Sequence, residues 1–323
     1  MKHEHVPDFS YLCLDISAIM TVRLSLVALI VFLNSVMGHS QNLRVTIPDP
    51  FQNYYYDYKL ANPALTGIHG KHAITTAYLG RPGDVDAYYA SYEARVPGIK
   101  SAVGVTAMLE DVFYLRSYHV GGLFSKQIPF NSESGLLVGT QVYYKKRITD
   151  LDEFYYYHQD DPLIIKRGDH TSANAGADFG VAFYRKNLTL AAGVKNVWVG
   201  DVPEQFGWAQ YEFTSFNLLF SNEFALTPAI ELVPSCLLVS YPDGRLLALN
   251  ATARIYKWVM VGAGNRFRNG SSEFSFNVGI NIKDWVQIVT HCYSSTNQKH
   301  EFDRPYMETL LRITVPDKGD DMK

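Results

Sequence analysis

The chain has 323 residues, of which only 19% are charged, and its formal net charge is −3 at pH 7. Acidic and basic residues are interspersed, so the sequence lacks the basic surface that binds nucleic acid and the polybasic run that binds an anionic membrane. Its 22 tyrosines and 18 phenylalanines suit β-strands and the aromatic girdles of membrane barrels.

The N-terminus predicts export from the cytoplasm. Residues 20–40 combine Arg23, an apolar run, and small residues placed for cleavage before Gln41, which is the pattern of a secretory signal peptide. The apolar run is short for a bilayer crossing, although an uncleaved anchor is the alternative. Residues 1–19 are interpreted as an upstream extension ahead of the true start.

Beyond Gln41 the dominant pattern is alternation with a period of two, which predicts strands. In residues 271–283, every second residue from Phe274 to Ile282 is apolar, and the residues between them are polar or glycine. Residues 87–96 and 246–255 alternate in the same way, with charges confined to one face. No run after Gln41 has the eighteen or so apolar residues that a membrane helix needs.

The same pattern predicts about fourteen strands. They are expected near residues 72–80, 86–95, 101–110, 113–126, 134–146, 174–184, 188–198, 212–226, 228–241, 245–256, 258–268, 271–283, 285–294 and 306–315. An even number of strands with charges on one face is typical of bacterial outer-membrane barrels, because a charge on the lipid side is costly. Every second connection is short, while the longest, residues 147–173, falls in the other set.

These observations predict an all-β protein, a transmembrane antiparallel outer-membrane β-barrel over residues 72–315 with short periplasmic turns and longer extracellular loops. Residues 41–71 are predicted to be a periplasmic N-terminal segment, and residues 316–323 a periplasmic C-terminal tail. A soluble β-sandwich or a large periplasmic β protein is the alternative, because each single strand signal is weak.

Two predicted strands fit the scheme poorly. Pro234 interrupts residues 228–241, where its missing N–H removes a ladder hydrogen bond. In residues 113–126, Arg116 and His119 fall on opposite faces, so neither face is free of polar groups. A β-bulge near either point would restore the register.

Short motifs in a consistent order indicate a family. Asn62, Pro63 and Ala64 are followed by Thr66 and Gly67 directly before the first predicted strand. The other motifs are Asp161-Pro162-Leu163, the paired strands of residues 179–197, and the closing strand that begins Glu308-Thr309-Leu310-Leu311. Together they resemble the PorP/SprF family, outer-membrane proteins of the type IX secretion system in Bacteroidota. Two stretches depart from the family pattern, residues 80–83 after the first strand and the closing strand, which lacks a terminal aromatic residue.

The resemblance implies a non-enzymatic barrel that is either a component of the secretion apparatus or the carrier and anchor of a secreted cell-surface adhesin, which it holds through the adhesin's C-terminal domain. The implied partners are membrane lipids, that adhesin domain, and periplasmic type IX secretion components. A porin-like channel for small solutes is the alternative.

The stretch Asn62-Pro63-Ala64-Leu65-Thr66-Gly67 has the chemistry of a tight turn. Pro63 fixes its own φ and pushes Asn62 to an extended conformation, while Gly67 permits a bend. We therefore expect this motif to pin the chain before the first strand, with a direct binding role as the alternative.

Two long loops contain candidate residues for partner contact. They are Tyr155, Tyr156, Tyr157, Phe206 and Trp208. Rigid aromatic rings are enriched at protein interfaces, although an aromatic girdle is an equal alternative. The acidic residues around 150–161 lack the register of a calcium loop, and no metal, cofactor or catalytic motif is present. No catalytic residue, metal ligand, cofactor or nucleic-acid partner is therefore predicted.

Overall fold

The structure is a computed structural model that describes residues 54–81, 85–112, 115–150, 169–199, 214–242, 244–268, 271–282, 285–295 and 306–315. The predicted extension 1–19, signal peptide 20–40 and tail 316–323 lie outside these ranges, as do residues 41–53. Within the described part of the chain, no helix is both long enough and apolar enough to cross a bilayer.

The described chain is almost entirely strand. Its elements are η1 (Tyr58–Leu60), η2 (Pro63–Leu65), β1 (His72–Arg81), β2 (Val85–Val96), η3 (Pro97–Ile99), β3 (Ser101–Val112), β4 (Leu115–Pro129), β5 (Ser134–Asp150), β6 (Asp169–Arg185), β7 (Leu188–Val199), β8 (Ser215–Asn222), β9 (Phe224–Thr227), β10 (Ile230–Tyr241), β11 (Gly244–Ile255), β12 (Val259–Arg268), β13 (Ser271–Ile282), β14 (Val286–Ser295) and β15 (Tyr306–Val315).

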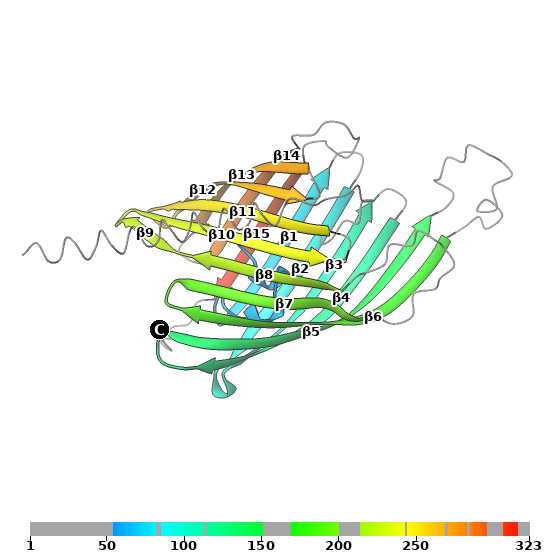
Figure 1. Ribbon diagram of the computed structural model, residues 1–323, viewed down its shortest axis with the longest axis horizontal. Helices are drawn as coiled ribbons and strands as arrows, with labels where there is room; N and C mark the ends of the chain where they lie inside the picture. Colours follow the sequence, from blue (N-terminus) through cyan, green and yellow to red (C-terminus); the bar gives the residue numbers. More distant parts are fainter. Residues whose placement is uncertain are drawn as a thin grey trace, which may run out of the picture. The chain divides into compact units, whose positions relative to one another are not determined.

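These strands form one closed antiparallel barrel (Figure 1). Sequence neighbours pair with one another, and closure comes from the pairing of β1 with β15, which runs from His72↔Val315 to Gly80↔Met307. The short β8 and β9 are two parts of one wall strand, so the wall has 14 strands. Closure joins the first strand of the sheet to the last, as the polar backbone requires in a bilayer. The predicted barrel fold is confirmed.

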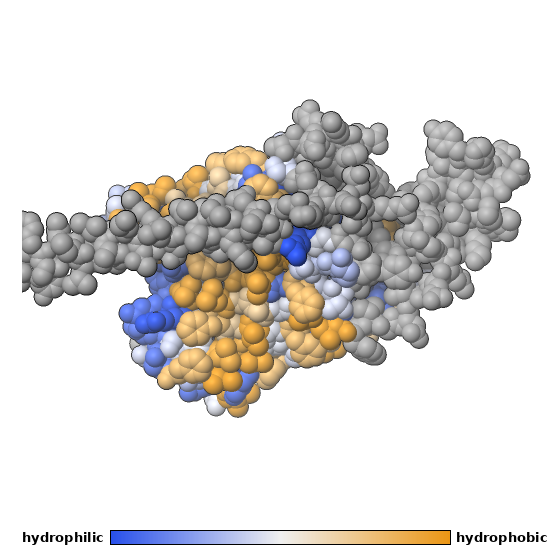
Figure 2. Space-filling model, viewed as in Figure 1, coloured by the Kyte–Doolittle hydropathy of each residue, from blue (hydrophilic) through white to orange (hydrophobic). Residues whose placement is uncertain are grey.

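The two faces of the wall are sorted as the alternation predicted. In β13, Phe274 is 49% exposed and Val278 48%, whereas Asn277 between them is fully buried. In β2, Tyr88 and Tyr92 face outward, and Glu93 faces the interior. Figure 2 shows apolar residues over much of the visible wall, with hydrophilic residues gathered at one end of the strands.

The two ends of the barrel differ in the lengths of their connections. One end, which we call the short-turn end, has connections 97–100, 130–133, 186–187, 228–229, 256–258 and 283–285. The opposite end, the loop end, has the long connections 151–168, 200–214 and 296–305 together with short ones. The strands β5 and β6 pair as far as Asp150↔Asp169, so the connection predicted at 147–173 is shorter than expected.

The two difficult strands have different explanations. The register of β4 is regular against both neighbours: Arg116 lies outside and pairs with Asp111 at 2.7 Å, while the ring of His119 packs on Tyr143 on the other face. In β10, pairing with β8 ends at Ser235↔Ser221 and resumes with β9 at Leu232↔Phe224. Pro234 therefore lies opposite the interruption between β8 and β9. The register is the same on both sides of this point and shifts only between Ile230 and Glu231.

A charge introduced on the lipid side should destabilise the barrel according to its depth. We expect Val278→Arg, in the middle of β13, to cost about 2–4 kcal/mol, and Ile282→Arg, at the end of the same strand, about 0–1 kcal/mol. The measurement is the free energy of unfolding in lipid vesicles by denaturant titration. Equal costs at the two positions would contradict this assignment of the lipid-facing surface.

Candidate functional site: the lumen segment

Residues 54–71, which we call the lumen segment, lie inside the barrel (Figure 1). They contact strands on opposite sides of the wall. The hydrogen bonds run from Tyr54 to Ala248 of β11, Tyr55 to His291 of β14, Tyr56 to Asn277 of β13, Tyr58 to Ser221 of β8, Asn62 to Ala192 of β7, Gly67 to Glu93 of β2 and Thr66 to Ser125 of β4. The sequence predicted a periplasmic segment over residues 41–71. Residues 54–71 of it lie in the lumen, where polar side chains and backbone carbonyls of the wall supply their partners.

Residues 62–66 of the Asn-Pro-Ala-Leu-Thr-Gly motif are all buried in this segment. Asn62 is fully buried, and its Oδ1 accepts a hydrogen bond from the backbone N–H of Ala64 at 2.9 Å, which caps the short helix η2. Its Nδ2 donates to the carbonyl oxygen of Ala192 at 2.7 Å. The same side chain therefore shapes the turn and attaches it to the wall.

Thr66 and Gly67 end the motif through contacts of their own. The Thr66 hydroxyl donates to the carbonyl oxygen of Pro63 at 2.8 Å, and Ser125 of β4 donates to the carbonyl oxygen of Thr66 at 2.9 Å. Gly67 has a φ of +83°, a conformation that other residues rarely adopt, and a Cβ there would overlap Ala102. The turn chemistry inferred from the sequence is thus present, with wall contacts added to it.

Glycines in the wall make room for the motif. A Cβ on Gly139 of β5 would lie 2.5 Å from the Cα of Ala64, and a Cβ on Gly180 of β6 would overlap the side chain of Asn62. Such distances are shorter than real Cβ contacts, so the backbone of the segment lies directly against the backbone of the wall. The motif therefore fits against the wall only because Gly139 and Gly180 have no side chain.

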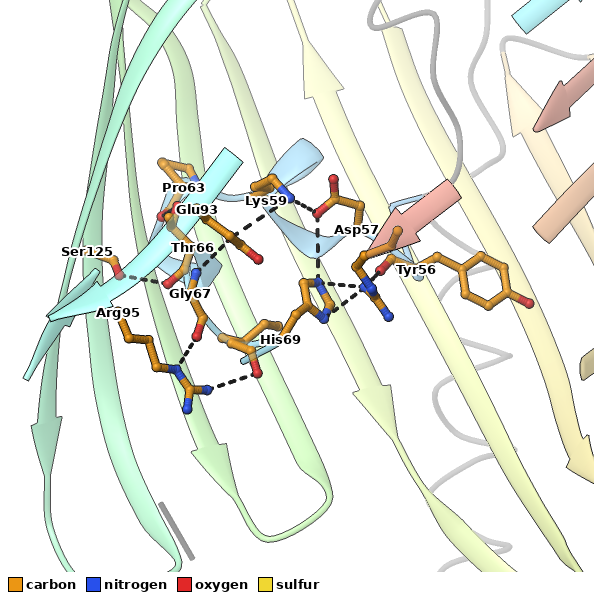
Figure 3. A network of polar contacts seen from close by, with 12 residues as sticks. Tyr56, Asp57, Lys59, Pro63, Thr66, Gly67, His69, Glu93, Arg95 and Ser125 are labelled. Atoms are coloured by element: carbon orange, nitrogen blue, oxygen red, sulfur yellow. Dashed lines mark hydrogen bonds and ion pairs between the residues drawn. The ribbon is translucent and has the colours of Figure 1, made fainter. Parts of the chain in front are cut away.

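Charged groups hold the rest of the segment (Figure 3). Lys59 Nζ lies 2.5 Å from Asp57 Oδ1 and 3.8 Å from Glu93 Oε2, and the three side chains are almost completely buried. Glu93 also accepts a hydrogen bond from the N–H of Gly67 at 2.8 Å. A buried charge that loses its partner costs about 3–5 kcal/mol, so this cluster ties the segment to β2.

Two arginines of the wall bind the backbone of the segment. Arg95 of β2 donates to the carbonyl oxygens of Gly67 and Ile68, and Arg312 of β15 donates to that of Tyr56. Arg312 Nη1 also lies 2.8 Å from His69 Nδ1. Because a guanidinium has only donors, His69 accepts here in its neutral form. Burial, followed by the charge of Arg312, lowers the pKa of His69, which belongs to the lumen segment and not to a strand, to about 4.

The structure brings together Asn62, Pro63, Ala64, Thr66 and Gly67 as the sequence grouped them. The other candidates, Tyr155, Tyr156, Tyr157, Phe206 and Trp208, lie outside the described residues. Sequence reasoning missed the lumen role of Tyr54, Tyr55, Tyr56, Asp57, Lys59 and His69. A signal was available, because the charges of residues 87–96, which include Glu93 and Arg95, are confined to one face, and charges that face a barrel interior need partners.

No metal centre is evident in this part of the molecule. Across the described ranges, no three or more His, Cys, Asp or Glu side chains are grouped so that they could hold a metal ion.

Comparison with known proteins decides the family. The family model described as type IX secretion system membrane protein PorP/SprF matches residues 46–310, which include the lumen segment and nearly all of the barrel. The chain belongs to the PorP/SprF family. No curated protein matches it in sequence.

Solved structures similar to this PorP/SprF chain are membrane barrels of low sequence identity. The monoaromatic hydrocarbon channel CymD has a TM-score of 0.50 and 10% identity, with 84% of this chain and 93% of CymD covered. The toluene transporter TbuX of Ralstonia pickettii has a TM-score of 0.48 and 10% identity, with 78% and 91% covered. Omp33 of Acinetobacter baumannii has a TM-score of 0.42 and 10% identity, with 76% and 98% covered. At such identities the match to CymD concerns the fold alone.

Removing the Asn62 side chain should loosen the lumen segment. We expect Asn62→Ala to cost about 1–2 kcal/mol, the cost of a lost cap, and to accelerate amide hydrogen exchange in residues 54–71 while the strands stay protected. Asn131→Ala is the matched control, because Asn131 Oδ1 likewise accepts from a backbone N–H two residues on, in an exposed turn. Equal exchange in both variants would show that Asn62 does not hold the segment.

Proposed function

We propose that this outer-membrane barrel works in type IX secretion through protein partnership, without catalysis. It serves either as a component of the secretion apparatus or as the carrier and anchor of a secreted adhesin, which it binds through the adhesin's C-terminal domain. The observation that carries the proposal is membership of the PorP/SprF family over residues 46–310. In this proposal the signal peptide 20–40 is cleaved, the short-turn end and both mature termini face the periplasm, and the long loops face outward.

The lumen segment supports partnership over transport of small solutes. Its hydrogen bonds reach β4 and β7 on one side of the wall and β11, β13 and β14 on the other, so the lumen is crossed by buried, hydrogen-bonded chain. An open diffusion pore needs a continuous water-filled lumen. We therefore propose that the barrel presents binding surfaces at its two ends and conducts no steady current.

Recovery of partners from native membranes tests the proposal. Tagged protein is extracted from native outer membranes with mild detergent, and the proteins that accompany it are identified. We expect either one large secreted adhesin, bound through its C-terminal domain, or periplasmic secretion components. Recovery of neither would contradict partnership and favour a channel.

Aromatic side chains of the long loops are proposed to contact the partner that lies outside. We expect Phe206→Ser combined with Trp208→Ser to reduce recovery of a secreted adhesin. The matched control replaces two exposed aromatic residues at the other end of the barrel, Phe130→Ser with Trp285→Ser, which are 62% and 53% exposed. An equal effect of both pairs would point to general instability and count against loop contact.

Electrical recording tests whether the lumen is closed. In planar bilayers we expect no steady conductance from the wild type, and an open state from Gly180→Leu, because a side chain there would displace Asn62. Gly122→Leu on β4 is the control, since a Cβ at Gly122 meets no atom within 4 Å. A large steady current in the wild type would contradict closure and favour the porin alternative.

A further inference from the structure

The strand β9 has a partner on one side only. Within the described residues it pairs with β10, through Phe224↔Leu232, Ala225↔Glu231 and Thr227↔Ile230, and it stands at the end of the sheet order. Each other strand of the wall has a neighbour on both sides over at least part of its length, although residues 169–175 of β6 pair with β5 alone among the described residues. Among the residues that the structure describes, its second edge has no partner.

The edge is open because β7 is too short to cover it. Pairing of β7 with β8 ends at Leu188↔Asn222, and the chain then turns at Lys186 and Asn187. The last backbone contact is the N–H of Glu223, which donates to the carbonyl oxygen of Asn187 at 3.2 Å. No described residue continues the line of β7 beside residues 224–227.

The edge also lacks the features that usually protect such strands. All four residues of β9 are exposed, and none is charged. Leu226 is 60% exposed and Phe224 41%. Natural edge strands are generally protected by lysine, proline or inward-pointing charge, and an apolar edge without them is a template for pairing.

Basic side chains lie at one end of this open edge. Arg185, the last residue of β6, and Lys186, in the turn that contacts Glu223, are both exposed. Lys186 forms a surface ion pair with Glu133 at 3.2 Å, while the carboxylate of Glu223 is engaged by Arg254 at 2.8 Å. A strand added beside β9 would end against this turn, where a carboxylate is favoured.

We propose that β9 is the docking edge for one extended strand of a periplasmic secretion component. The incoming strand pairs antiparallel with residues 224–227, matches the apolar side chains of Phe224 and Leu226, and places a carboxylate beside Arg185 and Lys186. Main-chain hydrogen bonds supply the binding and the side chains supply selectivity, as in other cases of strand addition. The inference rests on the proposed function for the existence of a partner and for the periplasmic position of the short-turn end.

Site-specific photo-cross-linking in the native host tests the proposal. A photoreactive amino acid replaces Leu226 in one variant and Phe216 of β8 in the control, two outward side chains that are each 60% exposed. We expect a single protein adduct from position 226 and none from position 216. Peptide mapping should place the cross-link in a strand of the partner that carries an acidic residue or the C-terminus at the end nearest Lys186.

Two further measurements make the test specific to strand addition. We expect the amides of residues 224–227 to exchange rapidly in the purified protein and slowly in the isolated complex. Arg185→Glu combined with Lys186→Glu should lower the adduct yield about tenfold, a change that corresponds to 1.4 kcal/mol. Lys100→Glu combined with Lys126→Glu, at exposed positions of the short-turn end outside this turn, should leave the yield unchanged.

The outcomes separate this inference from the proposed function. If partners still accompany the barrel but position 226 gives no adduct, or the amides stay unprotected, the edge proposal is overturned and partnership stands. An adduct with a second copy of this chain overturns it as well and makes the edge an interface between copies. Loss of every partner from the native extract contradicts the proposed function itself.

Discussion

Glu93 is the point at which the wall and the interior of this barrel are joined. Its carboxylate accepts the N–H of Gly67 and lies 3.8 Å from Lys59, which in turn pairs with Asp57. Each of these charges would be costly alone in a buried interior. The wall strand β2 therefore needs the lumen segment as much as the segment needs the wall. A 14-stranded barrel that turns polar residues inward must hold water or chain inside, and here it holds chain.

The outer architecture could be predicted because a membrane imposes a simple rule on each residue. Lipid-facing and inward residues must alternate, so Phe274, Val278 and Ile282 were correctly assigned to the outside, and Ser275 and Asn277 to the inside. Strand number followed from the same rule. Strand ends were less predictable, since the pairing of β5 with β6 continues through polar residues to Asp150 and Asp169. Beyond the apolar band, backbone pairing alone decides where a strand ends.

The lumen segment could be predicted only in part, because its contacts are distant in sequence. The turn formed by Asn62, Pro63 and Gly67 depends on neighbouring residues and could be predicted from the sequence. The wall glycines are different: Gly139 and Gly180 make room for residues more than 70 positions earlier, and nothing near them in sequence indicates why a side chain is excluded. Likewise, the Tyr55 hydroxyl hydrogen-bonds to the ring of His291, which is 236 residues away in the sequence. The polar interior is filled by contacts between residues that are far apart in the sequence. The alternation of apolar residues and the secondary-structure propensities do not predict such contacts.

The interruption between β8 and β9 is related to the proline in the neighbouring strand β10. Proline in β10 cannot donate a ladder hydrogen bond, so a continuous partner strand opposite Pro234 would leave a carbonyl without its donor. The chain resolves this by interrupting the partner at Glu223, whose carboxylate turns inward to Arg254. The interruption separates β9 from the wall strand that β7 covers, and the short β6–β7 turn leaves its edge bare. The proline at this point and the early end of β7 together leave residues 224–227 paired on one side only among the described residues.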